Sequence, residues 1–158
     1  MNKRTWKHYV FYILSAEAVG GLAAILTREG IARYGKEVVK PPLTPPAIVF
    51  PIVWTVLYAL MSISAAKISL VSPSASRTRS LVLYWVQLAF NFVWSLLFFN
   101  AGVYGFSFVW LGALLILIVW MIACFDKLNR SAAWLQLPYT LWVAFAGYLN
   151  YGVWILNR

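Results

Sequence analysis

Two carboxamide side chains lie inside an apolar stretch that is long enough to cross a bilayer. Gln87 and Asn91 interrupt the run 81–99, and Trp94 lies on the same face of the helix predicted there. An amide without a partner in hydrocarbon is costly, so these side chains must face protein, a ligand or trapped water. The chemistry this indicates is recognition by hydrogen bonding and stacking, at the wall of an intramembrane pocket.

Polar and aromatic residues recur at helical spacing on three predicted helices. They are Trp54, Tyr58 and Met61 on the first, Gln87, Asn91, Trp94 and Phe98 on the second, and Tyr139, Trp142, Ala146 and Asn150 on the third. If these faces converge, they enclose a cavity with flat aromatic walls that suits a large planar apolar ligand. The alternative is an aromatic interface between helices, with its polar groups paired across it.

Signatures of catalysis are missing from the sequence. It contains no nucleophile elbow, no phosphate-binding loop and no metal-ligand cluster, and His8, the one histidine, lies at the N-terminal edge. The pocket therefore has no imidazole for general base chemistry or haem ligation, and no required cofactor is predicted. A tetrapyrrole would be held by stacking and edge contacts, and basic residues of the first connection would meet its carboxylates.

Glu17 is an acidic residue in the middle of the first predicted helix. An intramembrane carboxylate can relay protons in a coupled transporter. The sequence offers no second intramembrane acid to receive the proton, which favours a neutral or hydrogen-bonded carboxyl near an interface. Its position also argues against a cleaved signal peptide.

The composition requires a membrane protein. Of the 158 residues, 63% are hydrophobic and 11% charged, more apolar surface than a soluble domain of this size can bury. The sequence predicts an all-α integral membrane protein, a single transmembrane domain over 1–158, with five spans at about 9–27, 46–70, 81–99, 103–125 and 132–156. The charge of +9 is spread over the ends of the spans, which indicates membrane topology and lipid headgroups as its partners and not nucleic acid.

The connection 28–45 is predicted to act as a lid. It has mixed charge and ends in four prolines between positions 41 and 46, which hold the backbone extended, and Thr44 is placed to cap the second span. Pro138 predicts a kink near the start of the fifth span. Ala16, Gly20 and Ala24 form a small-residue stripe that favours close packing of the first helix against a neighbour.

The basic residues predict the orientation. One side carries eight, namely Lys3, Arg4, Lys7, Lys67, Arg77, Arg79, Lys127 and Arg130, and the other side carries five, namely Arg28, Arg33, Lys36, Lys40 and Arg158. This imbalance favours a cytoplasmic N-terminus, and a bacterial cell membrane is the expected location.

Four segments in order resemble the translocator protein / tryptophan-rich sensory protein family, also called the peripheral benzodiazepine receptor family. They are Lys40-Pro41 with Thr44-Pro45-Pro46, Trp54 to Tyr58, Gln87 to Trp94 with Phe98-Phe99, and Pro138 to Trp142 with Leu149-Asn150-Tyr151. The resemblance implies a five-helix bundle, usually a homodimer, with a pocket beneath the first connection. Its ligands would be porphyrins, haem, cholesterol or synthetic drugs.

By matching position, the resemblance implies that Trp54, Asn91, Trp142 and Ala146 line the pocket and that Tyr34 reaches it from the lid. Leu43 stands where the family usually has tryptophan, which weakens an inference to the light-driven porphyrin breakdown associated with bacterial members.

The predicted function is binding of a porphyrin-type ligand, haem or a sterol in an intramembrane aromatic pocket, for tetrapyrrole handling, transport or stress sensing. The predicted contacts are Trp54, Tyr58, Gln87, Asn91, Trp94, Tyr139, Trp142, Ala146, Asn150 and Tyr34. Three alternatives remain: a small proton-coupled exporter using Glu17, a light-dependent porphyrin-degrading enzyme, and a regulatory scaffold that acts through a partner.

Overall fold

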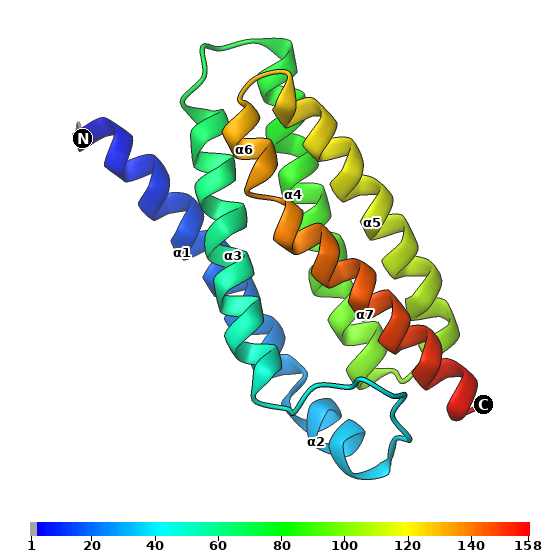
Figure 1. Ribbon diagram of the computed structural model, residues 1–158. Helices are drawn as coiled ribbons and strands as arrows, with labels where there is room; N and C mark the ends of the chain where they lie inside the picture. Colours follow the sequence, from blue (N-terminus) through cyan, green and yellow to red (C-terminus); the bar gives the residue numbers. More distant parts are fainter. Residues whose placement is uncertain (1–2) are drawn as a thin grey trace.

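The chain folds into a bundle of long helices joined by short connections (Figure 1). The computed structural model describes residues 3–158, with side chains from Thr5 onward, so the side chains of Lys3 and Arg4 lie outside the described residues. The helices are α1 (Lys3–Leu26), α2 (Arg28–Glu37), α3 (Val49–Ser69), α4 (Ala75–Ser95), α5 (Tyr104–Asp126), α6 (Arg130–Trp134) and α7 (Leu137–Leu156), and a π-helical turn η1 (Leu96–Asn100) continues α4. Over the described range the structure has no strand, as the sequence predicts.

Four stretches are long and apolar enough to cross a membrane: Thr5–Leu26, Val49–Ser69, Ala75–Asn100 and Tyr104–Asp126. They correspond to the first four predicted spans. The fifth prediction falls on α7, a helix of 20 residues without a charged side chain, whose tyrosines, tryptophans and Asn150 lower its hydropathy. The protein is thus a multi-pass integral membrane protein.

The second span begins later than the sequence indicates. Thr44 does not cap it, because the Thr44 hydroxyl donates to the carbonyl of Pro41 at 2.7 Å and α3 starts only at Val49. Pro51 therefore occupies the first turn of α3, where a helix needs no backbone N–H donor. The sequence places Pro51 inside the predicted span 46–70, whereas in the structure it lies where the helix starts.

The predicted span 132–156 is divided. The chain forms the short helix α6, turns at Leu135 and Gln136, and begins α7 at Leu137. Pro138 lies in the first turn of α7, which proline tolerates well. A break between two helices thus replaces the kink that the sequence predicts.

The predicted lid is part helix. Its first ten residues form α2, and only the following segment, 38–48, is extended or turned. We call residues 38–48 the strap. In Figure 1 the strap runs from α2 towards the C-terminal part of α7 before it returns to α3.

The first helix packs closely on α3. At Gly20 an added Cβ would lie 2.5 Å from the ring of Tyr58, so this contact requires glycine. Ala16 is fully buried, whereas Ala24 is exposed and does not take part. The small-residue stripe therefore does allow a close helix approach, over its first two positions.

We predict that Gly20→Ala destabilises the protein by about 1–3 kcal/mol, because the new methyl group overpacks the buried face against Tyr58. Gly21→Ala is the matched control, since a Cβ there meets nothing within 4 Å. Denaturant unfolding in detergent, followed by circular dichroism, measures both variants. Equal stability of the two would contradict this packing.

Candidate functional site

The hydroxyl of Tyr139 joins α7 to α4 through the two amides that stand out in the sequence. It donates to Gln87 Oε1 at 2.8 Å and accepts from Asn91 Nδ2 at 3.2 Å. Gln87 Nε2 also points to the sulfur of Met61 on α3, at 3.8 Å. Gln87 and Tyr139 are fully buried and Asn91 is 2% exposed, so this Tyr139 network supplies the partners that the amides require.

A second polar cluster lies nearer the lid. Asn150 Oδ1 accepts from Trp94 Nε1 and from Ser107 Oγ, each at 3.1 Å. Its Nδ2 donates to the carbonyl of Tyr104 at 2.8 Å. This Asn150 network ties α4, α5 and α7 together, and all three of these hydrogen bonds join one protein group to another.

The three predicted faces do converge. The ring of Trp54 lies 5.6 Å from that of Tyr58 and 6.3 Å from that of Tyr139, between centroids. Ala146 is buried on α7, 8% exposed. The polar groups at their centre pair with one another, as the alternative interpretation of a packed interface expects.

An apolar groove of about 550 Å³ lies beside this core, between α3 and α7. The backbone of α7 packs mainly along α5 and stands off from α3, which leaves room for the groove. Its walls are Ile52, Val53, Val56, Leu57 and Leu60 from α3, and Pro138, Leu141, Trp142 and Phe145 from α7. Several of these side chains, with Leu141 at 73% exposure, face outward where lipid surrounds the bundle.

Trp142 is the one predicted residue that lines the groove. Its ring also contacts Phe50 edge-on at 5.9 Å and Phe145 at 5.6 Å. The aliphatic wall residues could not be distinguished by sequence, because apolar side chains at this spacing look the same whether they face lipid or a groove. Among the groove residues that the sequence did not identify, only Phe145, three residues after Trp142, is aromatic.

Tyr34 belongs to the lid helix α2, and its ring packs on the aromatic core. Its ring is 5.4 Å from Phe98 and 5.5 Å from Phe99, and Phe98 stacks on Trp94 at 5.4 Å. Lys40 Nζ lies 5.3 Å from the centre of the Tyr34 ring. Burial raises the pKa of Tyr34 above its usual value, so its phenol is neutral at physiological pH.

The lid helix is anchored on the end of α4. Arg33 donates to the carbonyl of Asn100 at 2.9 Å, and Asn100 Nδ2 donates to the carbonyl of Leu26 at 2.9 Å. A Cβ on Gly30 would lie 2.4 Å from the carbonyl of Phe99, so α2 sits directly on η1. Arg33 is therefore engaged within the protein.

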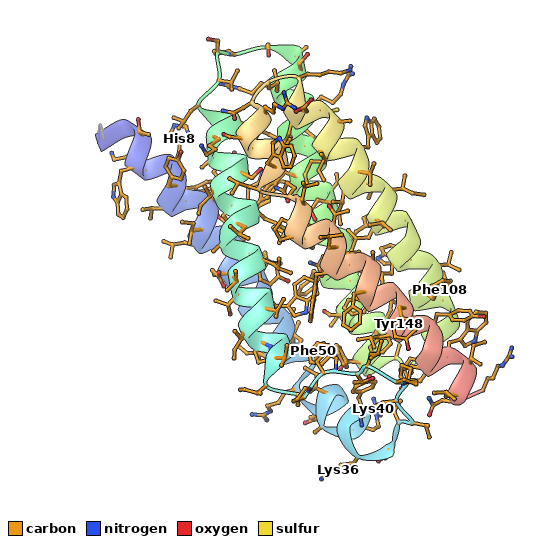
Figure 2. All side chains as sticks on the ribbon, viewed as in Figure 1. His8, Lys36, Lys40, Phe50, Phe108 and Tyr148 are labelled. Atoms are coloured by element: carbon orange, nitrogen blue, oxygen red, sulfur yellow. The ribbon has the colours of Figure 1, made fainter. Side chains whose placement is uncertain are left out.

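The strap is anchored on α7 by residues that the sequence did not single out. Asn157 accepts from Val39 N at 2.9 Å and donates back to Val39 O at 2.8 Å. The hydroxyl of Tyr148 donates to the carbonyl of Pro42 at 3.0 Å. Figure 2 shows Phe50 and Tyr148 near this end of the bundle, with Lys40 below them.

Glu17 is half-buried on α1, and no salt bridge or side-chain hydrogen bond to it occurs among the described residues. His8 Nδ1 lies 2.8 Å from Ser69 Oγ, far from the groove, and ties α1 to the end of α3. Residues 3–158 contain no group of three metal-ligating side chains.

Comparison with known proteins places this geometry in a family. The model of the TspO/MBR family matches residues 12–155. The chain belongs to this family. It is 33% identical to Protein CrtK of Rhodobacter capsulatus over 94% of this chain and 92% of that protein, and 33% identical to Tryptophan-rich protein TspO of Chlorobaculum tepidum over 89% of each. It is 32% identical to Translocator protein of Bos taurus over 97% of this chain and 92% of that protein.

Membership of the TspO/MBR family confirms the family resemblance seen in the sequence motifs. Two of those motifs supply the main members of both polar networks: Gln87, Asn91 and Trp94 on α4, with Tyr139 and Asn150 on α7. At least part of the family pattern thus has a structural basis in this chain.

We predict that Tyr139→Phe destabilises the protein by about 1–3 kcal/mol, because Gln87 and Asn91 lose a buried partner. Tyr151→Phe is the matched control, since Tyr151 is 48% exposed and its hydroxyl makes no hydrogen bond among the described residues. Thermal unfolding in detergent measures both. An unchanged midpoint for Tyr139→Phe would show that the network contributes nothing to the fold.

Proposed function

We propose that the protein is a membrane receptor or carrier that binds a planar apolar ligand of the tetrapyrrole class between α3 and α7. The observation that carries the proposal is the apolar groove beside a buried aromatic core, with Trp142 shared by both. Its volume of about 550 Å³ falls within the usual range of small-molecule sites, about 300–1,000 Å³.

The aromatic core supports a flat ligand in particular. The backbones of α3 and α7 stand apart, and two aromatic pairs bridge them, Trp54 with Tyr139 at 6.3 Å and Phe50 with Trp142 at 5.9 Å between ring centroids. A planar ligand in the groove stacks on Trp142 and reaches the other rings when Trp142 rotates. In this proposal, Gln87 and Asn91 support the wall from behind.

The lid supplies the charge that a tetrapyrrole carboxylate requires. Lys36 and Lys40 lie on the lid side of the bundle (Figure 2), although Lys40 Nζ also donates to the carbonyl of Gly35 at 2.9 Å. A carboxylate can take over that hydrogen bond as an ion pair. A ligand with an apolar ring system and acidic edge groups therefore fits better than a fully apolar one.

The names of the relatives agree with binding or sensing and do not indicate an enzyme: they include a translocator protein, a tryptophan-rich sensory protein and tryptophan-rich proteins. Among the described side chains, no hydrogen bond or ion pair of Glu17 favours proton-coupled export, and no arrangement of groups favours porphyrin oxidation. These two, and the regulatory scaffold, remain the alternatives drawn from sequence.

We predict that Trp142→Ala weakens binding of protoporphyrin IX about tenfold, because a stacking surface is lost. Trp120→Ala is the matched control, since Trp120 is 53% exposed on α5 and does not line the groove. The shift of the porphyrin absorbance band on titration into purified protein measures affinity without relying on the removed tryptophan. Equal affinity of both variants would remove the groove as the site.

We further propose that α7 is a fifth span and that the N-terminus is cytoplasmic. The ends of α3, α4, α5 and α6 that lie away from the lid carry Lys67, Arg77, Arg79, Lys127 and Arg130. Together with Lys3, Arg4 and Lys7 of the N-terminal segment they make eight basic residues, against five on the lid side.

This topology predicts which loop a membrane-impermeant thiol reagent reaches on intact cells. With Cys124 replaced by serine, Leu43→Cys on the strap is labelled, and Ser72→Cys between α3 and α4 is not until the cells are opened. Both positions are exposed, so accessibility within the protein is matched. The reverse labelling pattern would invert the orientation.

A further inference from the structure

The strap and the last turns of α7 form a two-sided contact. Asn157 pairs with both backbone groups of Val39, in the manner of a neighbouring strand, at 2.9 Å and 2.8 Å. Pro41 is buried against Gly152, where an added Cβ would lie 2.5 Å from the proline ring. The hydroxyl of Tyr148 completes the contact at the carbonyl of Pro42. We call these contacts the latch.

A row of aromatic rings connects the groove to the latch. Trp142 and Phe145 line the groove, and their ring centroids are 5.6 Å apart. Phe145 stacks on Tyr148 at 6.2 Å, with the ring planes 22° apart. The same tyrosine holds Pro42, so one side chain contacts both the groove wall and the strap.

We propose that this row makes the strap respond to the groove: an occupant between α3 and α7 displaces Phe145, shifts the ring of Tyr148 and releases the strap from α7. The proposal rests on the proposed function for the occupant, while the latch itself does not. Binding inside the membrane thereby changes the strap, which carries Lys40 on the aqueous side of the protein.

The coupling follows from how the rings of this row pack. Close-packed rings have few alternative arrangements, so an inserted ligand moves Phe145 as a unit and does not deform the wall gradually. The hydrogen bond from Tyr148 is sensitive to such a shift, because it weakens steeply when distance or angle changes. Two latch contacts remain after that loss, the exposed Asn157 side chain and the packing of Pro41 on Gly152, and they hold the strap more weakly than all three together.

Coupling of this kind is reciprocal. If an occupant favours the released strap by some factor, then releasing the strap by mutation raises affinity for the occupant, by at most that factor. Two independent measurements therefore have to agree in direction.

The latch is tested first in the protein without ligand, by hydrogen exchange at the Val39 amide, which donates to Asn157. We expect Asn157→Ala and Tyr148→Phe to speed this exchange about threefold to tenfold. Tyr151→Phe is the matched control on the same helix, and the amide of Ile31, which bonds within the lid helix to Thr27, reports that α2 stays folded. Unchanged Val39 exchange in both latch variants would overturn the latch.

The coupling is tested with protoporphyrin IX as the probe. Saturating probe is expected to speed Val39 exchange in the wild-type protein, and Asn157→Ala is expected to bind the probe more tightly, by no more than that factor. Tyr148 does not line the groove, and in Tyr148→Phe the hydrogen bond from the ring row to Pro42 is already lost, so saturating probe should change Val39 exchange less than in the wild type. Unchanged or slower exchange in the probe-bound wild type would overturn the coupling.

Failure of the two proposals can be told apart. If the probe does not bind the wild-type protein, the proposed function fails, while the response of Val39 to Asn157→Ala still decides the latch. If the probe binds and the strap does not respond, the proposed function stands and the coupling is wrong.

Discussion

The structure depends on pairing polar side chains where no water is available to pair them. The hydroxyl of Tyr139 meets Gln87 and Asn91, and the amide of Asn150 meets Trp94 and Ser107. Each of these groups would be costly alone in an apolar surrounding. Satisfied in this way, they fix which faces of α4, α5 and α7 point inward, something that interchangeable apolar contacts specify only weakly.

The same pairing explains why an apolar groove lies beside a polar core. Because long side chains such as Tyr139 span the interval between α7 and α4, the backbone of α7 does not need to approach closely and packs mainly along α5. The opposite flank of α7 is left facing α3 across open space. The groove between them is thus a result of how α7 is held on its other side.

Much of this could be predicted from the sequence. The apolar runs identified the helices, and the spacing of Gln87, Asn91 and Trp94 identified a buried face, because a polar group in an apolar run has few tolerable positions. The convergence with Tyr139 and Asn150 followed from the same reasoning. The sequence could not say that these groups pair with each other and not with a ligand, since that depends on how the helices are rotated and spaced.

Other features lay beyond sequence reasoning for identifiable reasons. Pro51 and Pro138 were assigned to helix interiors, although a shift of a few residues in the helix start puts each in a first turn, where proline is favourable. The charged residues of 28–37 suggested a connection, yet they form α2 because Gly30 lets the helix sit on η1. Asn157 and Tyr148 act on the backbone of a distant segment, and such contacts leave no periodic trace in either partner.

The sideways opening of the groove has a consequence for how its occupancy is governed. With Leu141 and other apolar side chains of the rim facing lipid, a ligand of the proposed kind would reach the groove from the hydrocarbon phase, where sparingly soluble compounds accumulate. Under the proposed function, occupancy would then be set by mole fraction in the bilayer and not by concentration in the aqueous phase. Lipid tails compete for the same space, so the thickness and composition of the host membrane become determinants of affinity in their own right.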